Sequence, residues 1–160
     1  MATRTKVLFD SRKLHDTLSQ KLIAEQTRRL LAYAEEELEK MAQSHAFINR
    51  TYNLEDSYVW SVFYNTVRQG YGFYGAKKAT EDSRYNEQDV DGRHLADKFS
   101  SSYRSTVSNG WEVVWAATAP YASALEMGKA PRRRSFEVVS QRYDHIRHKL
   151  MPYCRVTIII

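Results

Sequence analysis

Apolar side chains recur at three- and four-residue spacing between about Asp10 and Met41, with no Gly or Pro to interrupt them. This period predicts one long amphipathic helix over 10–42. Its apolar positions are Leu14, Leu18, Leu22, Leu30, Ala34, Leu38 and Met41. Four acidic residues of the second half are interpreted as its solvated side, namely Glu35, Glu36, Glu37 and Glu39. Because the helix exceeds the usual globular length, we expect part of its apolar stripe to contact a neighbouring subunit.

Alternation with a period of two follows over Tyr58 to Val67, and both sides of this predicted strand are largely apolar. Such a strand needs cover on both faces, from the long helix on one and from another helix or another copy of the chain on the other. We expect the strand to turn or bulge at the glycines of 69–75. A second alternating strand, 111–118, follows the turn residues Asn109 and Gly110, and forms a hairpin if 106–108 is also extended.

The remaining pattern predicts short elements around an exposed, charged insertion over 76–91. They are a helix over 92–105 capped by Asp91, a short helix over 120–128, a helical stripe over 136–150 and a C-terminal strand over 154–160. Together these elements predict a single domain over 1–160 of the α+β class. A long N-terminal helix and shorter helices should pack on a mainly antiparallel β-sheet.

Composition adds limits to this picture. A hydrophobic content of 42% with 11 Tyr predicts an ordered fold with surfaces suited to partners. The single cysteine, Cys154, allows no internal disulfide, and Met1 to Leu8 lack the apolar run of a signal peptide. No apolar run approaches the length of a membrane span, so we expect a soluble protein without a membrane partner.

Candidate catalytic and metal sites are weak. Asp89, Asp91 and His94, preceded by Glu81 and Asp82, have ligand-type side chains, but their spacing matches no known metal loop. A solvated loop is the favoured reading, and a small hydrolase built on this group is a distant third hypothesis. His145 and His148 share a helical face but lack the acidic partner of a metalloprotease. We therefore predict no catalytic residue, no metal site and no cofactor, and we do not expect an enzyme.

One basic patch stands out, formed by Lys129, Arg132, Arg133 and Arg134. Its position in a loop between two predicted helices suits contact with phosphates or carboxylates. A solvated loop whose cations oppose the acidic stretch of the first helix is an equal alternative. With the net charge of +5, the patch motivates an alternative function as a nucleic-acid-binding accessory protein.

Two short motifs carry a family resemblance. Residues 53–57, Asn-Leu-Glu-Asp-Ser, resemble the T-G-x-L-x-x-S motif of a tailed-bacteriophage family of neck and tail-completion proteins, with Leu54 and Ser57 at the matching spacing. Residues 121–128 resemble that family's Y-A-x-x-x-E-x-G segment. The matching positions there are Tyr121, Ala122, Glu126 and Gly128. The resemblance spans about 10–150, although Tyr52-Asn53 replace Thr-Gly and the insertion between the strands is longer than expected.

The resemblance implies a structural virion protein, a neck or tail-completion component located in the virion and assembled in the host cytoplasm. Identical subunits would form a hexameric ring that joins the head-closure or adaptor proteins to the tail-tube or tail-terminator proteins, with DNA passing through the channel. In this reading Leu54 anchors its loop in the core, Ser57 bonds nearby backbone and Gly128 ends a short helix. Double-sided apolar strands and an over-long helix also suit a fold completed by identical neighbours.

Overall fold

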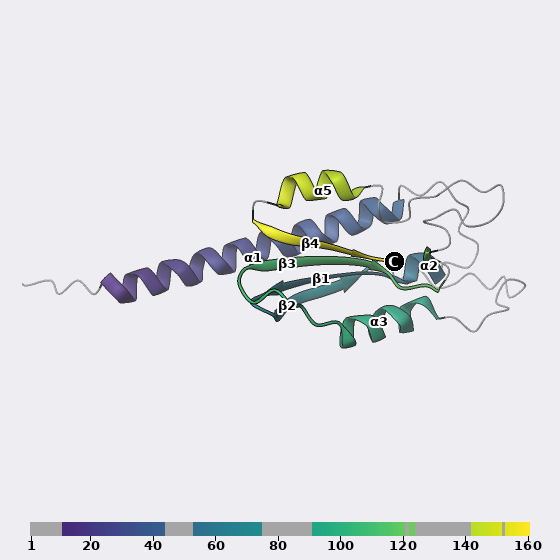
Figure 1. The fold of residues 1–160 in the computed structure, drawn as a ribbon, viewed down its shortest axis with the longest axis horizontal. Helices are drawn as coiled ribbons and strands as arrows, with labels where there is room; N and C mark the ends of the chain where they lie inside the picture. Colours follow the sequence, from purple (N-terminus) through teal and green to yellow (C-terminus); the bar gives the residue numbers. More distant parts are fainter. Residues whose placement is uncertain (1–10, 44–52, 75–90, 121, 124–141, 152) are drawn as a thin grey trace, which may run out of the picture.

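The computed structural model describes residues 11–43, 53–74, 91–120, 122–123, 142–151 and 153–160. Figure 1 shows one β-sheet with helices on both faces and a long first helix that extends beyond the sheet. This arrangement confirms the predicted α+β class. The elements in chain order are α1 (Ser11–Gln43), α2 (Asn53–Asp56), β1 (Tyr58–Tyr64), β2 (Val67–Phe73), α3 (Gly92–Ser102), β3 (Trp111–Ala117), α5 (Tyr143–Leu150) and β4 (Cys154–Ile159).

The sheet has four strands in the order β2-β1-β3-β4. The central strand β1 is antiparallel to both neighbours, and Trp60 lies opposite Trp115 in the register of β1 with β3. Strand β4 pairs parallel to β3. The chain between these two strands includes α5, which is the kind of connection that a parallel pair requires. The sheet is therefore mainly antiparallel, as predicted.

The second half of α1 and helix α5 cover one face of the sheet. Alternation directs Trp60 of β1 and Trp115 of β3 into this face, where they join one buried cluster with Leu38 of α1. The indole Nε1 of Trp115 donates to the backbone oxygen of Ala34 at 2.9 Å. Since this bond satisfies its polar atom, the largest side chain of the core is fully buried without an unpaired donor.

Helix α3 covers the opposite face. The second face of the sheet is therefore covered by a helix of the same chain. Val59 of β1, Ala116 of β3 and Ala96 of α3 form a second buried cluster. The helix begins as predicted, because Asp91 Oδ1 accepts from the backbone N–H of His94 at 3.1 Å. It ends at Ser102, slightly earlier than expected, because the following residue adopts an extended backbone.

The turn between β1 and β2 lies earlier than the sequence pattern indicated. Asn65 and Thr66 have positive φ angles of 47° and 68°, which make a tight two-residue hairpin turn, so Val67 begins β2 and does not end β1. Asn65 Oδ1 accepts from the N–H of Gly110 at 2.7 Å, which links the turn to the start of β3. Of the turn or bulge expected at 69–75, the structure has the bulge, because Gln69 of β2 is left over in the pairing with β1. The register shift lies where Val62 faces Gly70 and Phe63 faces Arg68.

The hairpin expected before β3, if 106–108 were extended, is absent. Residues 106–108 form no strand, and β3 pairs with β1 and β4 instead.

Two glycines of β2, which the sequence pattern assigned to a turn or bulge, pack closely against other elements. A Cβ at Gly70 would lie 2.6 Å from Leu31 Cδ2, and one at Gly72 would lie 2.7 Å from Trp60 Nε1. These positions are small because the long helix and an indole ring pack directly against the strand.

Candidate functional site

The first sequence motif has a structural position. Leu54 of α2 is buried in the main core, and the Ser57 hydroxyl donates to the Leu54 carbonyl at 2.7 Å. The Ser57 carbonyl in turn accepts from the backbone N–H of Thr118 at 3.2 Å and from its hydroxyl at 3.1 Å. Leu54 thus anchors the loop, and Ser57 ties it to the chain that leaves β3.

The structure brings the second motif next to the first, because Ala122 is buried in the same core cluster as Leu54. Other positions of this motif, Tyr121, Glu126 and Gly128, lie outside the described residues. The same holds for the basic patch Lys129, Arg132, Arg133 and Arg134, and for most of the charged insertion. The described part of the motifs therefore has a packing role, and its surroundings are core side chains and backbone.

The candidate catalytic groups occupy other roles. Asp91 caps α3, while Asp89 lies outside the described residues. His145 and His148 are exposed on α5. Burial raises the pKa of the Cys154 thiol to about 12, so this cysteine remains protonated near neutral pH. Among the described residues, no group of three or more His, Cys, Asp or Glu side chains is arranged to hold a metal ion.

The most unusual surface is the first half of α1, residues 11–29, which leaves the sheet near Thr27. There Thr27 Oγ1 accepts from Trp111 Nε1 at 3.3 Å, and the preceding turns project away from the domain (Figure 1). Three leucines on this half form what we call the leucine stripe. Their exposed fractions are 44% for Leu14, 50% for Leu18 and 70% for Leu22. A monomer gains nothing from this apolar surface, which makes it a candidate interaction site.

Helix geometry explains why the leucine stripe is not covered by its own domain. At about 100° per residue, Leu22, Leu18 and Leu14 are turned from the direction of the buried Leu30 by about 80°, 120° and 160°. The stripe therefore rotates progressively away from the sheet that buries Leu30. Even a longer sheet on the same face would leave Leu14 uncovered.

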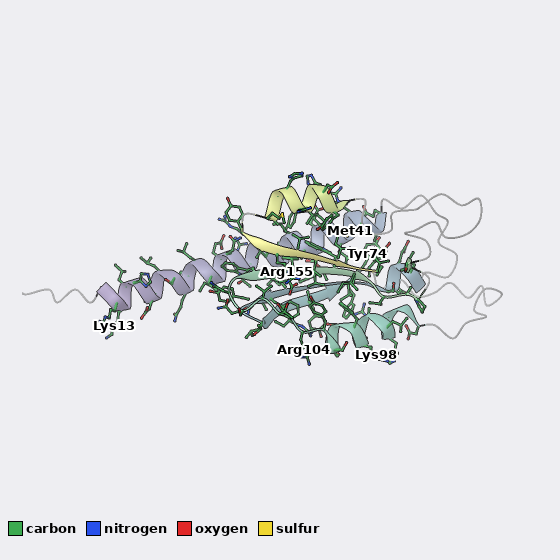
Figure 2. All side chains as sticks on the ribbon, viewed as in Figure 1. Lys13, Met41, Tyr74, Lys98, Arg104 and Arg155 are labelled. Atoms are coloured by element: carbon green, nitrogen blue, oxygen red, sulfur yellow. The ribbon has the colours of Figure 1, made fainter. Side chains whose placement is uncertain are left out.

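The charges of this first half are mainly positive. It carries five Lys and Arg residues against Asp16 and Glu25. Glu25 accepts from Arg28 at 2.9 Å and from Arg29 at 2.8 Å, and these hydrogen bonds lower the pKa of Glu25 to about 2. Figure 2 shows the side chains of this half, including the labelled Lys13, standing away from the rest of the molecule. The projecting surface is thus apolar on one side and cationic around it.

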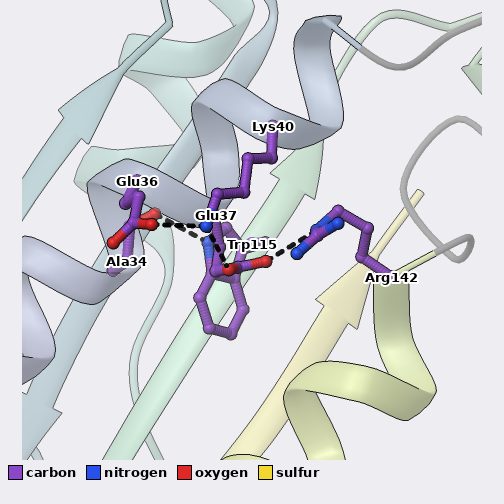
Figure 3. Close-up of polar contacts among 6 residues, drawn as sticks. All are labelled: Ala34, Glu36, Glu37, Lys40, Trp115 and Arg142. Carbon is purple, nitrogen blue, oxygen red and sulfur yellow. Dashed lines mark hydrogen bonds and ion pairs between the residues drawn. The ribbon is translucent and has the colours of Figure 1, made fainter.

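The second half of α1 corrects the sequence interpretation of its acidic run. Glu37 is buried, not solvated, and its carboxylate accepts from Arg142 at 2.7 Å and from Lys40 at 3.1 Å (Figure 3). Lys40 also pairs with Glu36. Burial by itself raises the pKa of Glu37, but the hydrogen bonds from Arg142 and Lys40 outweigh it, so the pKa is lowered. This buried ion pair attaches the residue before α5 to α1.

A second buried carboxylate, Glu112, lies under the opposite face. Its Oε1 accepts from Tyr103 at 3.2 Å and from Thr157 at 2.6 Å, and Arg155 Nε lies 3.7 Å away. Burial, with the Glu112 charge adding to it, raises the pKa of Tyr103. These contacts connect β3, β4 and the segment after α3. Among the described residues, the partners of Oε1 all belong to the fold, and the buried Oε2 has no hydrogen-bond partner.

A groove of about 430 Å³ lies between α3 and the ends of β3 and β4. Its apolar part is formed by Leu95, Phe99, Ala117, Ala119, Pro120, Ile159 and Ile160, with Lys98, Ser102, Thr118 and Ser123 at its polar positions. The volume is in the usual range of binding clefts. This α3 groove is suited to holding apolar side chains.

Sequence reasoning missed Glu37, Glu112 and the α3 groove. A signal for Glu112 was present, because it alternates with Val114 and Ala116 on one side of an apolar strand. Glu37 likewise lies next to Leu38 and one turn before Met41. The groove had no sequence signal, since its walls come from three separated segments.

Within the described residues, no helix is both long and apolar enough to cross a membrane. Comparisons with protein-family models, with curated proteins and with solved structures gave no match to this chain. The features of the chain that bear on its function are the exposed leucine stripe of α1, the α3 groove and the two short motifs.

Proposed function

We propose that this chain is a structural virion protein of a tailed phage, a neck or tail-completion component whose copies form a ring between the head-closure proteins and the tail. Its proposed activity is to bind identical copies and neighbouring virion proteins through complementary surfaces. The motif resemblance at 53–57 and 121–128 suggests the class of assembly, and the surface of α1 supplies the physical reason for self-association.

The observation that carries the proposal is the exposed leucine stripe on the first half of α1. Leu14, Leu18 and Leu22 lie on a helix segment that extends beyond the sheet, where no described element of the same chain covers them. Burying apolar surface yields roughly 25 cal/mol per Å², so this arrangement favours a partner that covers the stripe. A closed ring of identical copies provides such a partner for every subunit.

The particle itself provides the test. Phage particles produced with and without a functional copy of the gene should be purified, and their proteins identified by mass spectrometry. The chain should be present in wild-type particles, and antibody-linked gold should label the junction of head and tail. Loss of the gene should leave separate heads and tails in electron micrographs.

Absence of the chain from purified particles would refute the proposal. If the chain is absent from particles and instead binds DNA with an affinity that falls steeply with salt, the nucleic-acid-binding alternative is supported. A variant with Leu18→Gln and Leu22→Gln should reduce head-to-tail joining, whereas Val67→Thr, on an exposed apolar residue of β2, should not.

A further inference from the structure

The α3 groove and the leucine stripe lie at opposite ends of the molecule. The stripe is on the part of α1 that projects from the end of the sheet where β3 and β4 begin. The groove lies where these two strands end, beside the C-terminus and α3 (Figure 1). Figure 2 shows the same separation between the labelled Lys13 and Lys98. Since α1 is continuous over Ser11–Gln43, the stripe cannot fold back onto the groove of its own chain.

The two surfaces are complementary in polarity. The groove offers apolar walls, including Leu95, Phe99 and the exposed Ile160, and the stripe offers three leucines. Leu14 and Leu22 are about 12 Å apart along the helix axis, at about 1.5 Å per residue, so successive leucines lie close enough to enter one groove together. No described element of the same chain covers the leucine stripe, and Ile160 of the groove is 40% exposed.

The net charges around the two surfaces are also opposite in sign. Next to the groove, the Ser57 carbonyl holds Thr118 of the groove wall and so places α2 beside it. Helices α2 and α3, with the Asp91 cap, carry four carboxylates against two strong cations. These groups are Glu55, Asp56, Asp91 and Asp97, opposed by Arg93 and Lys98. Burial, with a contribution from the neighbouring Glu55 and Asp91 charges, raises the pKa of Asp56. The first half of α1 has the opposite excess, with five cations against two carboxylates.

We propose that the leucine stripe of one copy docks in the α3 groove of the next copy, with the cations of its helix facing the carboxylates around α2 and α3. The occupant is a second copy of this chain, and the inference rests on the proposed function in that it names the contact between ring subunits. Because the two surfaces differ, the contact is head-to-tail. Repetition of such a contact closes into a ring or extends as a filament.

Two complementary variants test this contact in purified full-length protein. Leu18→Gln with Leu22→Gln removes the stripe and keeps a good helix former, while Ser102→Trp fills the groove from an exposed position on α3. Val67→Thr is the matched control, because it changes an exposed apolar side chain outside both surfaces. Sedimentation velocity at increasing concentration reports the mass of each protein, and circular dichroism verifies that each is folded.

The wild-type protein and the Val67→Thr control should associate with rising concentration, and either interface variant alone should associate at least about tenfold more weakly. An equal mixture of the two interface variants should form a one-to-one dimer and no larger species. The reason is that the Leu18→Gln, Leu22→Gln variant keeps an intact groove and the Ser102→Trp variant keeps an intact leucine stripe. Restored pairing in the mixture distinguishes a head-to-tail contact from a symmetric one.

The docking proposal is overturned if the wild-type protein remains monomeric at its highest soluble concentration. It is equally overturned if either folded interface variant associates like wild type, or if the mixture gives no dimer. Should Ser102→Trp fail to fold, Ile160→Gln, at an exposed groove residue, replaces it. Failure of the proposed function is separable, because a chain absent from particles can still pass this test, and a chain found at the neck can fail it.

Discussion

The two halves of α1 have the same secondary structure but opposite surroundings. In the second half, Leu30, Leu38 and Met41 are buried against the sheet. In the first half, Leu14, Leu18 and Leu22 are exposed, although they recur at the same helical spacing. The difference shows that periodicity predicts a helix with an apolar face. Burial of that face depends on where the sheet ends and on how far the helix has rotated the leucines away from it.

The carboxylates of the two halves show the same contrast. Among the described residues, Glu25 pairs within its own helix, with Arg28 and Arg29, and it remains in contact with solvent. Glu37 is buried and pairs with Arg142, which precedes α5. The first contact is typical of an exposed helix surface, and the second joins two elements of the tertiary fold. The second half of α1 therefore belongs to the domain, and the first half is available to a partner.

Truncating a leucine in the second half should give the largest loss of stability. Leu38→Ala removes buried methyl groups from the main core and leaves a cavity, which should lower the free energy of unfolding by about 3 kcal/mol. Urea unfolding followed by circular dichroism measures this loss. A change below about 1 kcal/mol would mean that the second half of α1 is not packed in the core as described.

Removing the partner of Glu37 should have the next largest effect. Arg142→Gln leaves Lys40 as the remaining described partner of the buried carboxylate. It should cost about 2 kcal/mol, below the usual range because Lys40 remains and Arg142 is partly exposed. The same urea measurement applies. The double variant Glu37→Gln with Arg142→Gln is the control, and should recover part of the loss because no buried charge is left unpaired. If the loss of unfolding free energy in the double variant equals the sum of the losses in Glu37→Gln and Arg142→Gln, the two side chains do not interact.

Acid should weaken the domain through Glu37. Because the pKa of Glu37 is lowered by folding, its contribution to stability is complete above the ordinary value of 4.5 and is lost as the pH falls below it. Thermal unfolding between pH 7 and pH 3 should show this loss, reduced in Glu37→Gln. Added salt should leave the contribution of Glu37 to stability largely unchanged, because its ion pair is buried. It should screen the exposed contacts of Glu25. An unchanged acid profile in Glu37→Gln would contradict the assignment.

Truncating a leucine in the first half should have the smallest effect on folding. Leu18→Ala removes exposed apolar atoms, so the free energy of unfolding of the dilute protein should change by no more than about 0.5 kcal/mol. Urea unfolding of Leu18→Ala and Leu38→Ala at the same low concentration compares the two halves directly. A loss in Leu18→Ala as large as that of Leu38→Ala would show that the leucine stripe is already covered within one chain.

Much of the fold could be predicted from the sequence because local patterns determined it. The period of the leucines predicted α1, and Asp91 marked the start of α3. The alternation over 58–67 and 111–118 predicted β1 and β3, which the structure ends at Tyr64 and Ala117. The β1–β2 turn could not be located from the glycines alone. Asn65 and Thr66 adopt the left-handed backbone there, and the contacts of Asn65 with Gly110, distant in the sequence, hold it in place.

By itself, the sequence determined which segments are helical or extended and which of their faces are apolar, because these properties depend on neighbours a few positions away along the chain. Only the tertiary structure decided that Glu37 and Glu112 are buried, that the α3 groove exists and that the sheet ends before the leucine stripe. Burial depends on which distant segments meet, and local spacing carries no information about where a covering surface stops.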